Sequence, residues 1–126
     1  MEDIIKILIV DDETDIADML SAFLSAKGFE CETVYNGKDA ILKIKGGKFD
    51  VVLLDVMLPY IDGYHVAYEV TTEMEKPPQI IIMTSRDTQF EKNIAKMSGA
   101  FEIIQKPFNL DQVFETIKKA IERRKR

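Results

Sequence analysis

Val51-Val-Leu-Leu-Asp55, followed by Val-Met-Leu-Pro59-Tyr-Ile-Asp62-Gly63, is the most informative stretch of this 126-residue sequence. Its four consecutive large apolar residues are too few for a buried helix but are typical of a strand that is covered on both faces. A carboxylate ends the strand pattern, and the turn formers Pro59, Asp62 and Gly63 follow it. Asp55 should therefore lie where a central strand gives way to a loop, which is where open α/β sheets bind their ligands.

Four other segments have strand patterns, two before this stretch and two after it. Ile4–Val10 and Gln79–Thr84 are mostly apolar and rich in β-branched residues, which predicts central strands. Glu30–Tyr35 alternates polar and apolar residues, as expected of a strand nearer the sheet edge. Phe101–Gln105 is the last predicted strand.

Apolar residues at helical spacing predict a helix after each strand. The predicted helices cover residues 16–24, 38–45, 64–72, 90–97 and 110–121. Such alternation implies a parallel sheet, because right-handed crossovers need a helix between parallel neighbours. The predicted fold class is α/β: a doubly wound five-stranded parallel sheet of order 2-1-3-4-5, which is the flavodoxin-like (βα)5 arrangement.

Composition limits the function classes. With 46% hydrophobic residues, 31% charged residues and a net charge of -5, the chain does not resemble a general binder of nucleic acid or membrane surfaces. Its one cysteine, Cys31, excludes an internal disulfide and is expected to be a small buried hydrophobe. The basic end, Arg123–Arg126, is interpreted as the last turn of a helix.

The sequence contains neither a basic leader nor an apolar stretch near the roughly 20 residues needed to cross a bilayer. We therefore expect a cytoplasmic protein that consists of one domain over residues 1–126, without a separate effector domain.

Polar residues stand at the carboxyl ends of four predicted buried strands: Asp11 and Asp12, then Asp55, Thr84 and Lys106. Parallel strands direct these ends to one edge of the sheet. Clustered carboxylates repel one another unless a cation holds them, and hard oxygen ligands without histidine or cysteine suit Mg²⁺. Mg²⁺ also favours a phosphate oxygen among its ligands, so the predicted site is one for a phosphoryl group.

Asp55, at the centre, is the candidate nucleophile, which would form an acyl phosphate by in-line attack. Lys106 would add a positive charge and Thr84 a hydrogen bond. Each residue also has a plain structural interpretation, since Asp12 could cap the first helix, Thr84 could be an ordinary strand residue, and Lys106 could belong to a simple loop. His65, the only histidine, is expected to be exposed.

These residues closely resemble the receiver domain of bacterial response regulators, the phosphoacceptor part of two-component signalling. The resemblance covers the whole chain and rests on four motifs in order. They are Ile-Leu-Ile-Val-Asp11-Asp12-Glu13, Leu-Leu-Asp55-Val-Met-Leu-Pro59 with Asp62-Gly63, Met83-Thr84-Ser85, and Lys106-Pro107-Phe108.

The resemblance implies that Asp55 accepts phosphate from a sensor histidine kinase or a histidine phosphotransfer protein, and that an effector protein of unknown identity acts downstream. It implies that Asp12, Asp55 and the backbone carbonyl of Met57 bind Mg²⁺ directly, with Asp11 acting largely through water. It also implies a cis peptide bond before Pro107.

Three positions depart from the family pattern or modulate it. The family usually has Tyr or Phe three residues before the lysine, where this chain has Ile103, so we expect a smaller conformational change on phosphorylation. Met57 cannot orient an attacking water and Arg86 could lie across the phosphoryl oxygens, so we expect a long-lived acyl phosphate.

Three other functions share parts of this pattern. The main alternative, an aspartyl-nucleophile phosphohydrolase, normally needs a second aspartate two residues after the nucleophile, where this chain has Met57. In a flavodoxin-type FMN binder, the acidic run Asp11-Asp12-Glu13 would repel the phosphate. An inert receiver-like module would not need the acceptor residues that are present. We therefore predict a signalling phosphoacceptor that catalyses only its own phosphorylation and dephosphorylation.

Overall fold

The strands form one parallel sheet with the order β2-β1-β3-β4-β5, which confirms the predicted topology. The strands are β1 (Lys6–Val10), β2 (Glu30–Val34), β3 (Val51–Asp55), β4 (Gln79–Thr84) and β5 (Glu102–Gln105). The computed structural model describes residues 4–125, so the ends of the predicted domain and the last residue of the basic run 123–126 lie outside the described residues. β2 lies at an edge, as its alternating pattern predicted.

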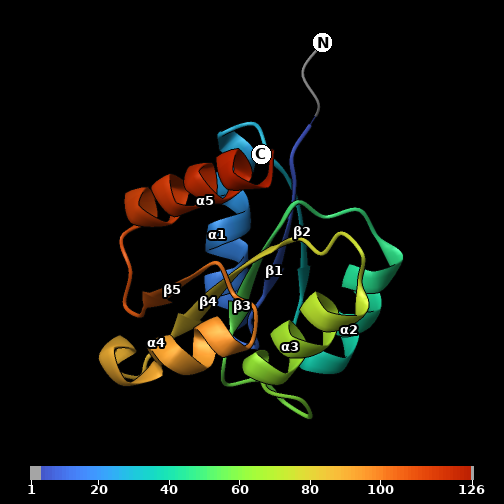
Figure 1. Cartoon of the computed structure of the whole chain (residues 1–126). Coiled ribbons are helices and arrows are strands. Elements are labelled where there is room, and N and C mark those ends of the chain that lie inside the picture. The colour runs from blue at the N-terminus through green and yellow to red at the C-terminus, as the bar shows by residue number, and fades with distance from the viewer. Residues whose placement is uncertain (1–3, 126) are drawn as a thin grey trace.

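Helices cover both faces of this sheet (Figure 1). They are α1 (Thr14–Ala26), α2 (Gly37–Gly46), α3 (Gly63–Glu73), α4 (Thr88–Met97) and α5 (Leu110–Arg124). Successive strand residues point to opposite faces, so the core has two halves. Ile7, Ile9 and Leu53 pack with α1 and α5, whereas Leu8, Val52 and Leu54 pack with α2, α3 and α4.

Side-chain caps begin four of the helices. Asn36, Asp62, Asp87 and Asn109 each accept a hydrogen bond from a backbone N–H in the first turn. Such caps satisfy backbone donors that have no partner within the helix. α1 is different, because the side chain of its N-cap residue, Glu13, makes no capping hydrogen bond.

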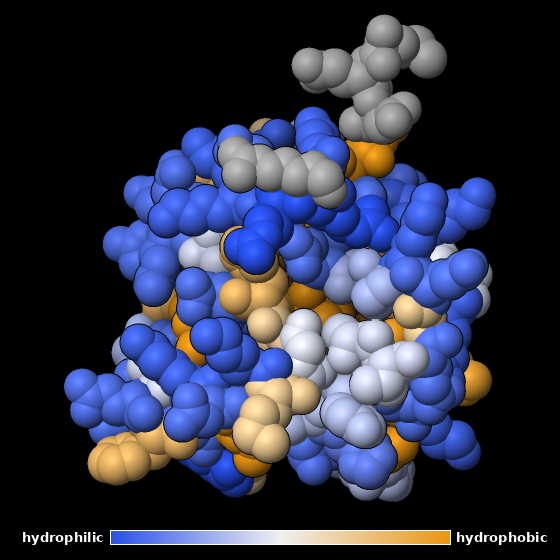
Figure 2. Space-filling view, in the orientation of Figure 1, coloured by the Kyte–Doolittle hydropathy of each residue, from blue (hydrophilic) through white to orange (hydrophobic). Residues whose placement is uncertain are grey.

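The apolar residues that predicted α4 do not form its buried face. Phe90, Ile94 and Met97 are 84%, 49% and 79% exposed, and Ala95 is the buried residue of this helix. The helix was predicted correctly because the spacing is helical, but spacing alone does not say which face meets the sheet. Figure 2 shows hydrophobic surface over this helix.

Cys31 is half-buried on the edge strand β2, not fully buried as predicted. An edge strand has a neighbour on one side only, which leaves its side chains more accessible than those of central strands. Partial burial raises the pKa of its thiol, opposed by a hydrogen bond with Ser25. Within residues 4–125, no helix combines the length and apolar character that crossing a bilayer requires.

Candidate functional site

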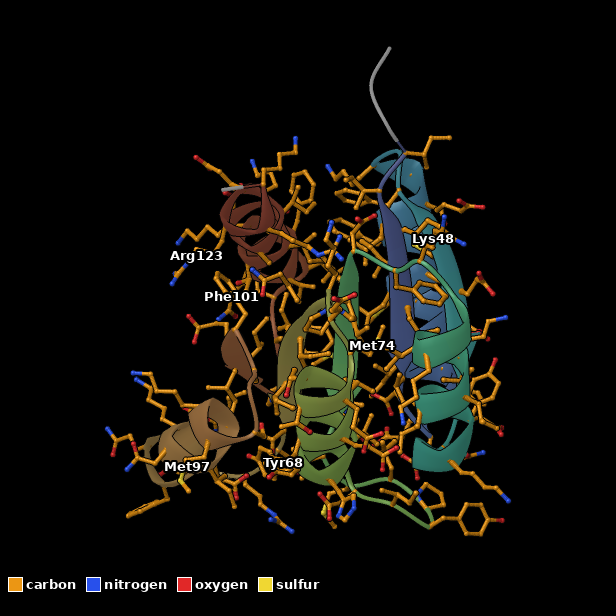
Figure 3. All side chains as sticks on the ribbon, turned by 45° about the vertical axis from the view of Figure 1, so that its right-hand side comes forward. Lys48, Tyr68, Met74, Met97, Phe101 and Arg123 are labelled. Carbon is orange, nitrogen blue, oxygen red and sulfur yellow. The ribbon has the colours of Figure 1, made fainter. Side chains whose placement is uncertain are left out.

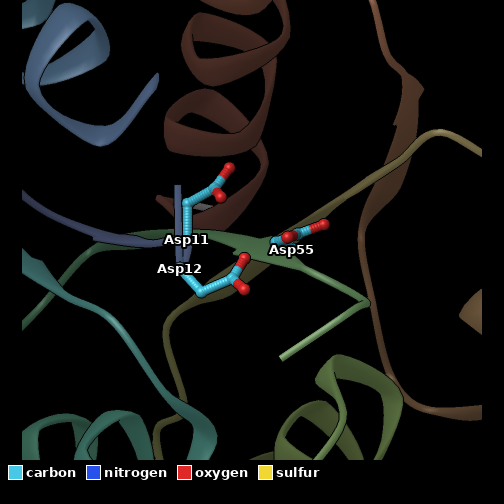
Figure 4. Close-up of side chains that lie close together, drawn as sticks. All are labelled: Asp11, Asp12 and Asp55. Carbon is cyan, nitrogen blue, oxygen red and sulfur yellow. The ribbon is translucent and has the colours of Figure 1, made fainter. Parts of the chain in front are cut away.

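The five residues predicted from the strand ends come together at one edge of the sheet. Asp11, Asp12 and Asp55 each place a carboxylate oxygen within 4.8 Å of the others (Figure 4). Asp11 is fully buried and Asp55 is 4% exposed, whereas Asp12 faces solvent. Two deep carboxylates and one accessible carboxylate therefore line the same small volume.

Lys106 lies against this acidic cluster. Its Nζ is 2.8 Å from Asp11 Oδ2 and 3.5 Å from Asp55 Oδ1. Burial would lower the pKa of the ammonium group, but the hydrogen bond to Asp11 and the charge of Asp55 outweigh burial and raise it. The Lys106-Pro107 peptide bond is cis, as the resemblance implied, and the Lys106 N–H donates to the carbonyl oxygen of Thr84 at 2.7 Å.

Asp55 has the most perturbed carboxyl group at this edge. Burial and the neighbouring charge of Asp11 raise its pKa to about 6, although Lys106 and the Met57 backbone N–H act in the opposite direction. A strand-end carboxyl group with a raised pKa and a cationic neighbour is typical of a functional site. Ionised Asp55 is therefore held at an energetic cost that a cation or a covalent modification would relieve.

Asp11 and Asp12 have different environments. Asp11 Oδ1 accepts a hydrogen bond from the Glu13 N–H at 2.9 Å, and its Oδ2 faces Lys106. Both Asp11 oxygens thus have protein partners, which agrees with an indirect role. The N-cap residue of α1 is Glu13, and Asp12 precedes it. The structural interpretation in which Asp12 caps the first helix is therefore wrong.

Thr84, at the end of β4, is fully buried. Its Oγ1 accepts a hydrogen bond from the Arg86 N–H at 3.0 Å, so the hydroxyl group has a partner within its own loop. A hydroxyl group can accept and donate at once, so Thr84 retains a proton to donate to a group bound beside Asp55.

The loop after β3 approaches Asp55 closely. A Cβ added at Gly63 would lie 2.3 Å from the backbone oxygen of Asp55, so only glycine fits this position. Tyr60 has a φ of 70°, in the left-handed region that favours glycine, and its side chain is 86% exposed. The Asp62-Gly63 turn signal therefore reflects close packing against the backbone of the central aspartate.

Arg86 and Met57 contact each other beside the acidic cluster. Arg86 Nη2 is 3.2 Å from Met57 Sδ, and Arg86 Nη1 is 3.4 Å from Glu91 Oε2. The Tyr64 hydroxyl group donates to the other oxygen of Glu91. Sequence reasoning identified Met57 and Arg86 but missed Glu91 and Tyr64, since strand order does not say which side chains of α3 and α4 meet.

A groove of about 960 Å³ extends from Asp12 and Met57 between α3 and α4. Tyr68 of α3 and Met97 of α4 line it, and both are labelled in Figure 3. His65, which also lines the groove, is exposed as predicted. Ile103 lies apart from the groove on β5, where it is half-buried and packs against the core beneath α2, α3 and α4.

Comparison with known proteins gives one consistent result. The family model described as the response regulator receiver domain matches residues 7–118. A CheY-like response regulator receiver domain protein from Methanospirillum hungatei JF-1 is 26% identical, with a TM-score of 0.91 and 98% of each chain covered.

Two further solved structures extend this comparison. TrrA of Thermotoga maritima, determined in complex with Mg²⁺-BeF, is 33% identical with a TM-score of 0.83, and the match covers 93% of this chain and 99% of TrrA. NtrX of Brucella abortus is 27% identical with a TM-score of 0.88, and the match covers 98% of this chain but only 28% of NtrX.

Proposed function

This chain belongs to the response regulator receiver domain family of two-component signalling, and from that membership we propose that Asp55 is its phosphoacceptor. The observation that carries the proposal is the convergence of three carboxylates within 4.8 Å, with Lys106 Nζ 3.5 Å from Asp55. Each residue has another use alone, but together they provide a nucleophile and a counter-charge for a phosphoryl group.

The chemistry is a direct transfer between two side chains. A carboxylate oxygen of Asp55 forms a bond to phosphorus while the bond between phosphorus and the histidine nitrogen of the donor breaks. The electron pair of the broken bond stays on the imidazole nitrogen, and Asp55 becomes an acyl phosphate. Lys106 balances charge on the phosphoryl oxygens, and Thr84 donates its hydroxyl proton to one of them.

The residues present fit a divalent cation. Asp12 and Asp55, with the backbone carbonyl of Met57, would hold Mg²⁺, and Asp11 would act through water because its own oxygens are engaged by Glu13 N–H and Lys106. When bound, Mg²⁺ would neutralise charge in the acidic cluster and on the phosphoryl group. The all-oxygen donor set supports this assignment, as does the structure of TrrA in complex with Mg²⁺-BeF.

The partner that supplies the phosphoryl group is a sensor histidine kinase or a histidine phosphotransfer protein, and a cytoplasmic location would bring the two together. We propose that residues 1–126 form one receiver domain and that its acyl phosphate alters a surface to which an effector protein binds. Its role is signalling and not turnover of a free substrate, because the Met57 thioether cannot serve as the general acid that a phosphohydrolase needs.

The test is phosphorylation by a small-molecule donor. Incubation with acetyl phosphate and Mg²⁺ should increase the intact mass by about 80 Da, one phosphoryl group. The adduct should be absent when EDTA replaces Mg²⁺ and absent in Asp55→Asn. Asp18→Asn is the matched control, because Asp18 is an exposed aspartate on α1.

A full-size adduct on Asp55→Asn would place the phosphoryl group elsewhere and contradict the proposal. So would the complete lack of an adduct on the folded wild-type protein with both Mg²⁺ and donor present.

A further inference from the structure

Glu91 links the acceptor edge of the sheet to helix α3. One of its carboxylate oxygens faces Arg86 at 3.4 Å, and the other accepts the hydrogen bond from the Tyr64 hydroxyl group. Glu91 is in the first turn of α4 and Tyr64 in the first turn of α3. The chain therefore ties the beginnings of two helices through a single carboxylate.

This carboxylate is less accessible than the arginine that it faces. The Glu91 side chain is 14% exposed, whereas that of Arg86 is 52% exposed. Moving the Glu91 carboxylate would break its contact with Tyr64. The Arg86 side chain is the more exposed of the two, so its guanidinium group can leave Glu91 and bind another partner at little cost. Arg86 is therefore the movable member of the pair.

Arg86 also contacts the acceptor site by two routes. Its backbone N–H donates to Thr84 Oγ1 at 3.0 Å, and its Nη2 lies 3.2 Å from Met57 Sδ. Met57 follows Asp55 by two residues, and Thr84 ends the adjacent strand β4. A dianionic acyl phosphate on Asp55 would offer the guanidinium group a stronger anionic partner than a single carboxylate.

We infer that Glu91 is a positioning residue that competes with the acyl phosphate for Arg86. In the unmodified protein Glu91 holds Arg86 beside Met57, and phosphorylation draws Arg86 away from Glu91. This inference rests on the proposed function of Asp55 and assigns its regulation to a residue on α4. When Arg86 moves to the acyl phosphate, its contact with Glu91 is lost. Glu91, Tyr64 and Arg86 all line the groove between α3 and α4, so this loss changes the wall of the groove.

The experiment measures the lifetime of the acyl phosphate. Protein is phosphorylated with acetyl phosphate and Mg²⁺, the donor is removed, and loss of the adduct is followed by intact-mass spectrometry. Arg86→Ala should shorten the lifetime. Glu91→Gln should lengthen it by about two- to fivefold, the range expected for removing one partly exposed ion pair, because Arg86 then has no competing carboxylate.

A double variant separates competition from a structural effect. In an Arg86→Ala background, Glu91→Gln should have no further effect on the lifetime, because the residue for which Glu91 competes is absent. Glu115→Gln is the matched control, since Glu115 lies on α5 in an exposed ion pair with Lys118 at 3.1 Å. It should leave the lifetime unchanged.

Two results would overturn the inference: an unchanged or shorter lifetime in Glu91→Gln, or a Glu91→Gln effect of the same size with and without Arg86. Urea denaturation of each variant verifies that it is folded. Formation of the adduct on the wild-type protein and its absence in Asp55→Asn test Asp55 as acceptor separately, so failure of the proposed function and failure of this inference give different results.

Discussion

At the scale of single residues, the acceptor site shows that one carboxylate is held in an unfavourable environment by its neighbours. Asp55 is buried beside Asp11, and its pKa is raised to about 6 from an ordinary value of 3.8. Since the folded-state pKa lies above that of the unfolded chain, the folded state binds the proton more tightly. The ionised Asp55 therefore lowers the unfolding free energy by its full amount above the folded-state pKa. This loss of stability decreases as the pH drops through about 6, and it vanishes below the pKa of the unfolded chain.

Replacing Asp55 with asparagine should therefore stabilise the protein at pH 8 in the presence of EDTA. We expect a gain in unfolding free energy on the order of 1–2 kcal/mol. At pH 4.5 the gain should be much smaller, because Asp55 is then protonated in the folded wild type. Urea denaturation at both pH values measures the difference, and an equal gain at both would contradict the charge-based explanation.

Tyr60 is a second residue held at a conformational cost. Its φ of 70° is strained for any residue with a Cβ, and its ring is 86% exposed and so gains little from packing. Tyr60→Gly should raise the unfolding free energy by about 0.5–1 kcal/mol. Tyr60→Ala, which keeps the strain, should give no comparable gain in the same thermal or urea unfolding experiment. Equal stabilisation by alanine would attribute the effect to loss of the ring.

At the scale of helices and strands, sequence periodicity predicted the order and type of every element because strands with two covered faces and amphipathic helices leave different patterns. β3 was predicted residue for residue, since an apolar run ending in Asp55 leaves no ambiguity. β1 begins at Lys6, two residues later than predicted, because the paired residues of the ladder begin at Lys6, although the Ile5 carbonyl oxygen accepts a hydrogen bond from the Glu30 N–H at 2.9 Å.

The acceptor residues could be predicted for the same reason, since strand order alone brings the ends of β1, β3, β4 and β5 to one edge. The contacts of Glu91 could not, because they depend on how closely α3 and α4 approach and on the side-chain conformation of Arg86. Packing between helices on the same face is set by the whole core. The sequence therefore identified the chemistry of the site but not the network around it.

The strand β5 carries the next prediction. Ile103 is half-buried against the core beneath α2, α3 and α4. Its side chain is branched at Cβ, which restricts rotation about χ1, so it does not swing between an inward and an outward position as the ring of a tyrosine or phenylalanine can. Phosphorylation should therefore leave amide NMR shifts of β5 and α5 nearly unchanged, with changes confined to the residues around Asp55 and Thr84 and to the segment from Arg86 to Glu91. Ile103→Tyr should spread the changes into β5. A large concerted shift across β5 and α5 in the wild type would contradict this prediction.

At the scale of the whole molecule, the two ends of the strands have separate tasks. The carboxyl ends hold the acidic cluster, which destabilises the fold, whereas the amino ends are joined by polar contacts that stabilise it. Asp50, just before β3, accepts hydrogen bonds from the Lys6 backbone N–H at 2.9 Å and from Arg124 of α5 at 2.7 Å. One aspartate thus ties the last helix to the first strand.

This division predicts variants that change stability without changing the chemistry at Asp55. Arg124→Ala removes a partly exposed ion pair and should cost about 0.5–1 kcal/mol of unfolding free energy. Asp50→Ala should cost more, about 1–3 kcal/mol, because it also leaves the Lys6 N–H without its acceptor. Urea denaturation measures the costs, and intact-mass kinetics with acetyl phosphate should give wild-type phosphorylation and dephosphorylation rates for both. A changed lifetime of the acyl phosphate in either variant, measured where the protein remains folded, would show that the two ends of the sheet are coupled.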